Sequence, residues 1–186
     1  MIARVSHISN FSNIAREHFA SLLLIEKKFQ NSKNEPEKDS LEADMGKEAM
    51  IVILFSTTAI EAYIYDYAAR HFSDTFVRNY IDRLDILSKW VLVPYLITKK
   101  ELPRDGEWFS LLKEIVRRRN SLTHHKSSGI PSNIHKARKH IENLHDESEE
   151  IVVTAKKSIR LLDLIVDAVT KNNPEEKPWI ETYLKE

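Results

Sequence analysis

Cysteine is absent from this sequence of 186 residues, and glycine occurs only three times. Without cysteine the chain has no disulfide, no thiolate nucleophile and no zinc–thiolate site. The glycines are too scattered to build the phosphate loop of P-loop or dinucleotide-binding proteins, and the H-E-x-x-H zinc motif is missing. Thiol chemistry and these glycine-loop sites are therefore excluded, and we expect no cofactor and no metal.

Long hydrophobic runs are missing as well. The longest uncharged stretch covers 49–60 and is ended by Glu61, whereas a membrane-spanning helix needs about 20 apolar residues. The first ten residues lack the continuous apolar core of a signal peptide. We therefore expect a soluble, cytoplasmic protein that does not contact a membrane.

The residues that are abundant favour helices. Charged residues make up 30% of the chain, Leu, Ile, Lys, Glu and Ala are frequent, and no stretch of any length alternates as a strand does. The length allows a sizeable core. We predict an all-α bundle that forms one domain over 1–186, with a long buried central helix and a helical tail at 174–186.

Proline, glycine and capping residues set the expected helix boundaries. We predict a polar loop at 31–40, a kink or break at Pro94, and a helix end between 121 and 126. The predicted helices cover, in order, 12–30, 41–72, a short segment capped at 73–74 that runs to 84, 85–98, a helix after the turn at 103–106, 132–144 and 148–170.

Charge is unevenly distributed although the chain is neutral overall. Residues 108–140 contain eight Lys or Arg and a single acidic residue, Glu114, and five acidic residues follow at 142–150. A local basic region on a neutral protein suggests an anionic ligand held at one place. A solvated basic helix face is the plainer alternative.

The densest cluster of functional groups is the stretch RRRNSLTHHK at 117–126. Arg119 continues a helical spacing set by three apolar residues that share one face, Trp108, Leu112 and Ile115. Arg119 therefore falls on the stripe that should face inward, whereas Arg117 and Arg118 point away from it. An arginine on a buried stripe needs a partner or a function.

Glu61 is the expected partner of Arg119. It interrupts the apolar face of the predicted central helix, which the same spacing assigns to Met50, Leu54, Thr57, Ile64 and Ala68. A structural ion pair between the two residues would explain both charges. It is compatible with ligand binding, because Glu61 can hold the guanidinium while the remaining donors face a ligand.

The segment from Arg119 to His124 has the form R-N-x-x-x-H and resembles the signature of the HEPN (higher eukaryotes and prokaryotes nucleotide-binding) family. Two further segments are similar to pieces of HEPN proteins in the same order. These are TAIEAYI at 58–64, on the central helix, and Ser88-Lys89-Trp90, with Pro94 beyond. Together the resemblance covers about 43–161, and it implies an all-α fold.

The resemblance also implies an activity. The matching positions assign Arg119, Asn120 and His124 to a metal-independent endoribonuclease site at a homodimer interface, with products that end in a 2′,3′-cyclic phosphate. RNA is the implied partner. We consider a role as a toxin or antiphage component, with an antitoxin protein as a further partner.

These residue types suit RNA cleavage on chemical grounds. Histidine titrates near neutral pH and can take the 2′-hydroxyl proton. The guanidinium fork of Arg119 can stabilise charge on the phosphoryl oxygens. Asn120 can donate to phosphate or orient the imidazole. Four further side chains are candidate phosphate contacts: Arg118, His125, Lys126 and Lys136.

Two other interpretations stay open. One is a non-catalytic module that binds nucleotide, RNA or a protein partner, and the other is a structural bundle with an incidental basic patch. Metal binding by histidine is disfavoured, because His135, His140 and His145 are spaced by five and do not share one helical face. Ser121 and Thr123 are expected to bond to the backbone or face solvent, and Tyr63, Tyr65 and Tyr67 to belong to the core.

Overall fold

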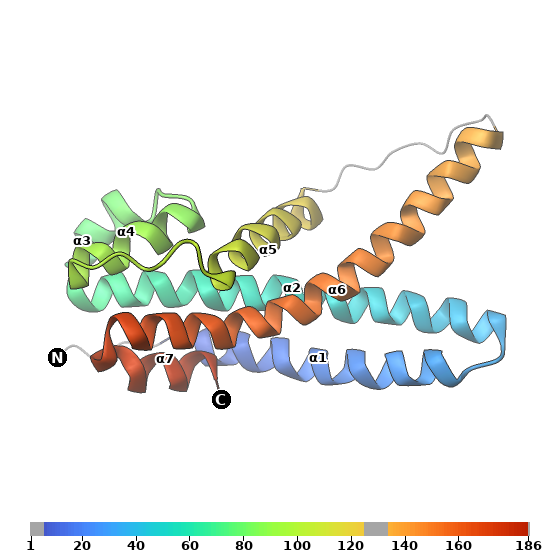
Figure 1. Ribbon diagram of the computed structural model, residues 1–186, viewed down its shortest axis with the longest axis horizontal. Helices are drawn as coiled ribbons and strands as arrows, with labels where there is room; N and C mark the ends of the chain where they lie inside the picture. Colours follow the sequence, from blue (N-terminus) through green and yellow to red (C-terminus); the bar gives the residue numbers. More distant parts are fainter. Residues whose placement is uncertain (1–5, 125–133, 186) are drawn as a thin grey trace.

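The computed structural model describes residues 6–124 and 134–185, and for 134–148 it describes the backbone alone. Every regular element in these ranges is helical, which confirms the all-α prediction (Figure 1). The elements are α1 (Ile8–Asn31), α2 (Glu35–His71), α3 (Asp74–Phe76), a π-helical turn η1 (Val77–Ile81), α4 (Ile86–Thr98), α5 (Glu107–Thr123), α6 (Ile134–Asn172), a 3-10 turn η2 (Pro174–Glu176) and α7 (Lys177–Leu184).

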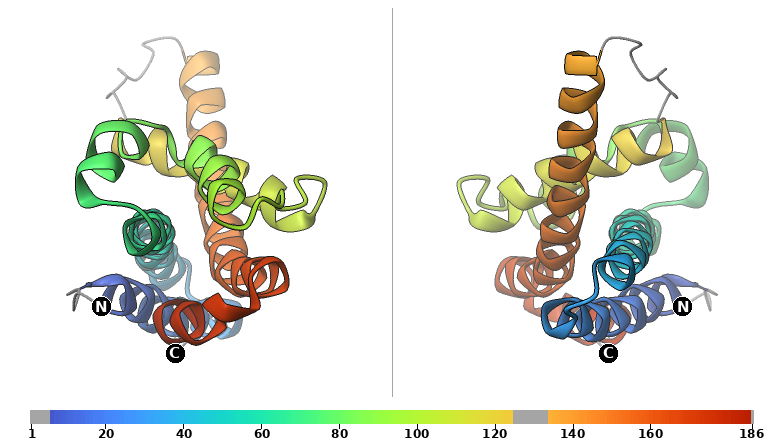
Figure 2. Two further views of the ribbon diagram at one scale, coloured as in Figure 1. Left: turned by 90° about the vertical axis from the view of Figure 1, so that its left-hand side faces the viewer. Right: turned by 90° about the vertical axis from the view of Figure 1, so that its right-hand side faces the viewer.

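Helix α2 is the centre of the bundle, as its apolar middle predicts. It contacts α1, α4, α5, α6 and α7. Figures 1 and 2 show α1 and α7 on one side of α2, and α3, α4 and α5 on the other. Its side chains from Val52 to Ala69 are largely buried. A helix that is apolar on nearly all sides has to be covered on all sides, and these neighbours cover it.

An aromatic cluster connects α4 and α5 to α2. The ring of Trp90 on α4 stacks on Tyr63 of α2 at a centroid distance of 6.0 Å. Its other neighbour is Trp108 of α5, edge-on at 6.2 Å. Burial of such large rings stabilises this junction strongly. The aromatic cluster therefore holds the N-terminal part of α5 against the central helix.

The predicted loop at 31–40 is wrong at its C-terminal end. Only 32–34 separates α1 from α2, because α2 already begins at Glu35. Pro36 lies in the first helical turn, where its missing N–H has no helical partner to lose. The acidic side chains of Glu35 and Glu37 also favour this end of the helix.

Side chains cap the N-terminal ends of α3 and α4. The Ser73 hydroxyl accepts a hydrogen bond from the backbone N–H of Phe76, which confirms the predicted cap. Asp85 accepts from the N–H groups of Leu87 and Ser88 at the start of α4. The Ser88 hydroxyl and these N–H groups hold the pKa of Asp85 below its usual value. Of the kink or break predicted at Pro94, the break does not occur, since α4 continues through Pro94 to Thr98.

Helix α6 is a single helix, whereas the sequence predicted two helices at 132–144 and 148–170. The predicted interruption at 145–147 contains no glycine or proline, and polar residues alone do not end a helix. Helix α6 slants across α1 and α2, and its N-terminal turns extend beyond the other helices in both figures. Its apolar residues from Ala155 to Val169 pack into the core.

Helix α2 is also, among the described residues, the one helix whose length and composition would allow it to cross a membrane. An 18-residue window within it has a mean hydropathy of 1.4, and half of that window is buried inside the bundle. The short uncharged run at 49–60 therefore does not by itself exclude a membrane span. The same apolar window is expected of a helix at the centre of a bundle, because the neighbouring helices bury it.

The C-terminal tail packs against α6, α1 and the end of α2. Ile180 and Leu184 of α7 are fully buried. A polar cluster accompanies them: the Arg70 guanidinium pairs with the buried carboxylate of Glu176 and, at 2.8 Å, with Asp66. The Tyr63 hydroxyl donates to Glu176 at 2.6 Å. Sequence analysis gave no role to this cluster, which joins residues more than a hundred positions apart.

Replacing Arg70 is expected to destabilise the fold. Arg70→Met leaves the Glu176 carboxylate, which is 3% exposed, without its cation, and breaking a buried pair in this way costs about 3 kcal/mol. Urea unfolding monitored by circular dichroism measures the change. The matched control is Arg104→Met, because the pair of Arg104 with Glu101 is exposed and should contribute below about 1 kcal/mol. Equal losses in both variants would contradict the assignment.

Alkaline pH should weaken the same region. Burial, followed by the charge of Glu176, raises the pKa of Tyr63 well above its usual value of 10.0. Folding therefore favours the protonated phenol, so this stability is fully present below about pH 10 and is lost as the pH rises further. Unfolding free energies measured upward from pH 9 should fall more steeply for the wild type than for Tyr63→Phe. Parallel curves would show that Tyr63 does not contribute.

Candidate functional site

The ion pair predicted between Arg119 and Glu61 is present. A terminal guanidinium nitrogen of Arg119 donates to Glu61 Oε2 at 3.2 Å, which joins α5 to α2. The pair forms because Leu112 and Ile115, on the same face of α5, are fully buried against the core and carry Arg119 to its edge. Side-chain exposures of 27% for Arg119 and 39% for Glu61 place the pair at the rim of the core and within reach of solvent.

Glu61 has a second cationic partner that sequence reasoning missed. The ammonium of Lys89 on α4 lies 3.4 Å from Glu61 Oε1 and 3.5 Å from a carboxylate oxygen of Asp82. The Lys89 side chain is only 4% exposed. The structure therefore contains a row of alternating charges, Asp82, Lys89, Glu61 and Arg119, which ends at the motif helix.

A sequence signal for Lys89 did exist. It lies in an otherwise apolar segment, so the argument applied to Arg119 and Glu61, that a charge on a buried face needs a partner, applies to it as well. Its neighbour Trp90 is fully buried, which places Lys89 close to the core. The segment had been interpreted only as part of the family resemblance.

Arg118 does not point away from the core, so that prediction is wrong. Its side chain is 11% exposed, less than that of Arg119, and its guanidinium lies 3.6 Å from a carboxylate oxygen of Glu150. The reason is that α6 packs along α5 on this side and covers Arg118. Arg117 does face solvent as expected. Arg118 therefore connects α5 to α6, and its guanidinium is partly neutralised.

Asn120 and His124 lie at the exposed C-terminal end of α5. The helix ends at Thr123, inside the predicted window, and the N–H of His124 donates to the carbonyl of Asn120 at 3.0 Å. Among the described residues neither side chain has a hydrogen-bond or ion-pair partner. The Thr123 hydroxyl donates to the carbonyl of Arg119, as expected.

The site is thus assembled in part. Glu61, Arg119, Asn120 and His124 lie on one end of α5 and the adjoining face of α2, with Arg119 held and His124 presented to solvent. His125 and Lys126 lie outside the described residues. Lys136 belongs to α6, where the side chains of 134–148 are likewise outside the description, so its proposed contact with phosphate stays a prediction.

The cluster can bind an anion and move a proton. Arg119 supplies a positive charge that is partly shielded from water. Because of this shielding, its attraction for an anion is stronger than in bulk solvent. The His124 imidazole is free to meet a ligand. Among the described side chains, no group of three His, Asp or Glu residues could hold a metal ion. The side chains of His135, His140 and His145 are not among those described. The tyrosines Tyr63 and Tyr67 are buried, which confirms their place in the core.

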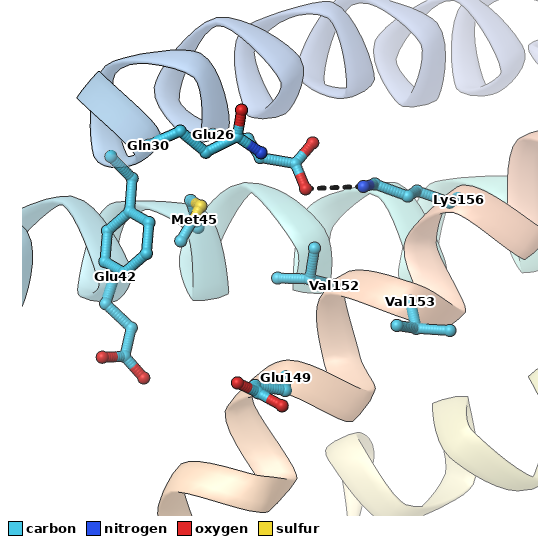
Figure 3. A pocket seen from close by; sticks show the side chains of 9 residues that line it. Glu26, Gln30, Glu42, Met45, Glu149, Val152, Val153 and Lys156 are labelled. Atoms are coloured by element: carbon cyan, nitrogen blue, oxygen red, sulfur yellow. Dashed lines mark hydrogen bonds and ion pairs between the residues drawn. The ribbon is translucent and has the colours of Figure 1, made fainter.

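A pocket of about 290 Å³ lies elsewhere, between α1, α2 and α6 (Figure 3). Its apolar lining comes from Phe29, Met45, Val152 and Val153. Glu26 and Lys156 form an ion pair of 2.6 Å across it. Its charged lining is predominantly acidic, with Glu42 and Glu149 in addition. Such a lining repels phosphate, so the pocket is not the site predicted from the motif.

Comparison of the chain with protein-family models, with curated proteins and with solved structures gives no match.

Proposed function

We propose that this protein is a metal-independent endoribonuclease of HEPN type that acts on RNA in the cytoplasm as a toxin or antiphage-defence component. The observation that supports this most is the pairing of Arg119 with Glu61 at the exposed rim of the core. The pair holds one guanidinium nitrogen and leaves other donors for a ligand, on the same helix end that presents Asn120 and His124.

The proposed reaction is an internal transesterification. A histidine takes the proton of the 2′-hydroxyl, the 2′-oxygen attacks phosphorus, and the bond from phosphorus to the 5′-oxygen breaks. The products are a 2′,3′-cyclic phosphate and a 5′-hydroxyl, whose proton comes from a general acid. Arg119 stabilises the extra negative charge on the phosphoryl oxygens in the transition state, and Asn120 donates a hydrogen bond to phosphate or to the imidazole.

Two histidines serve this reaction better than one, because a base and an acid act on opposite sides of phosphorus. Each chain supplies one His124, five residues after Arg119. A homodimer that brings two α5 ends together would therefore supply both groups. His125, Lys126 and Lys136 would extend the positive surface along the RNA. Arg118 would contribute less, since Glu150 already lies beside it.

A specific observation also favours the non-catalytic alternative, a module that binds nucleotide, RNA or a protein partner. No described side chain orients the His124 imidazole, whereas general bases are usually oriented by a third group. Catalytic hydrogen bonds often form only when substrate is bound, so cleavage remains the first proposal. A binding module would show saturable, salt-sensitive RNA affinity without cleavage.

Removing either central side chain should abolish cleavage. Arg119→Ala and His124→Ala are each expected to lower the rate of RNA cleavage by about a hundredfold or more, because one removes transition-state charge stabilisation and the other the proton acceptor. The assay contains EDTA and identifies 2′,3′-cyclic phosphate ends. Arg104→Ala is the matched control, since it removes an exposed arginine near the opposite end of α5 and should leave the rate unchanged.

Wild-type rates in both site variants would refute the site. Salt-dependent RNA binding with no cleavage by the wild type would select the non-catalytic module instead. Circular dichroism should show unchanged helix content in every variant, because both replaced side chains lie outside the fully buried core.

We also expect the protein to form a homodimer in solution. Light scattering coupled to size-exclusion chromatography should give the mass of two 21.7-kDa chains. Mixing Arg119→Ala with His124→Ala chains should then not restore cleavage, because a site that takes one His124 from each chain keeps only a single histidine in such a heterodimer. A strict monomer at assay concentration would contradict a mechanism that takes its acid and its base from different chains.

A further inference from the structure

The two carboxylate oxygens of Glu61 serve different helices. Oε2 accepts from Arg119 on α5, and Oε1 faces the Lys89 ammonium on α4. A carboxylate held from both sides has its orientation restricted, whereas one held at a single oxygen can rotate about its terminal torsion. The position of Glu61 therefore depends on Lys89 as well as on Arg119.

Lys89 is the better anchored of the two cations. Its residue is 3% exposed, and its neighbour Trp90 is fully buried in the aromatic cluster with Tyr63 and Trp108. A buried ammonium is stable only when carboxylates compensate its lost hydration. Asp82 and Glu61 provide that compensation. Lys89 is thus a fixed point to which Glu61 is attached.

Arg119 has few anchors of its own. Among the described residues, its Nε is buried without a hydrogen-bond partner and Glu61 is its one ion-pair partner. The orientation of the guanidinium is consequently set by Glu61. The charges from Asp82 to Arg119 alternate, so removing the Lys89 ammonium would both release Glu61 and leave a net negative charge beside the arginine.

We infer that Lys89 is a positioning residue for the ribonuclease reaction, which acts through Glu61 to aim the Arg119 guanidinium at the scissile phosphate. The inference rests on the proposed function. Lys89 itself does not touch RNA in this scheme. Because it acts on a group that stabilises the transition state, its removal lowers kcat more than it raises KM.

Steady-state cleavage by four variants tests this scheme. Lys89→Met keeps the length of the side chain and removes the charge, and should lower kcat about tenfold, within the range found for residues of one charge network. Lys89→Arg keeps the charge and should restore most of the activity. Glu61→Gln combined with Lys89→Met should be no slower than Glu61→Gln alone, because both act through one carboxylate.

The matched control is Asp82→Asn. It changes the other partner of the same ammonium, which leaves Lys89 and Glu61 in contact, so kcat should stay within about twofold of the wild type. Multiplicative losses in the double variant, or a wild-type kcat for Lys89→Met, would overturn the inference. Thermal unfolding of each variant distinguishes a loss of fold from a loss of positioning.

A second measurement does not depend on cleavage. Nuclear magnetic resonance relaxation of the Arg119 Nε–H reports how rigidly the guanidinium is held. Its order parameter should fall in Lys89→Met and in Glu61→Gln and stay near the wild-type value in Asp82→Asn. An unchanged value in Lys89→Met refutes the positioning role even if the protein is not a nuclease. If Arg119→Ala cleaves normally while this value falls as expected, the proposed function alone fails.

Discussion

The middle of α2 is apolar on nearly all sides, and covering it dictates how the other helices pack. Each charge on this helix then has to be neutralised by the helix that covers it, since a buried charge without a partner is strongly destabilising. Glu61 meets Lys89 from α4 and Arg119 from α5. The candidate site is therefore a consequence of how the central helix is buried, and it stands where two covering helices meet.

The same requirement operates at the C-terminal end of α2. Asp66 and Arg70 lie one turn apart there, and Glu176, from the segment that leads into α7, is the second carboxylate that pairs with Arg70. Here the cluster is closed, because the Glu176 carboxylate is buried and saturated by Arg70 and Tyr63. At Glu61 the cluster remains open to solvent. That difference in exposure separates a structural ion cluster from one able to meet a ligand.

Sequence reasoning identified the open cluster from two interruptions of apolar spacing, at Glu61 and at Arg119, and their contact confirms that part. Lys89 was missed because its segment was assigned only to the family resemblance, although Lys89 too is a charge in an otherwise apolar segment. Arg118 was misplaced because helical spacing on α5 cannot show that α6 packs on that side. That Arg119 and His124 cleave RNA is a prediction of the R-N-x-x-x-H resemblance.

The sequence by itself determined the all-α class, the central position of α2 and the cap at Ser73, because local spacing, propensity and side-chain hydrogen bonds act over one or two turns. Tertiary structure decided which further charges meet. Lys89 lies 28 residues from Glu61, and Arg70 lies 106 residues from Glu176. Such contacts depend on the path of the whole chain, and so do the partner of Lys89 and the burial of Arg118.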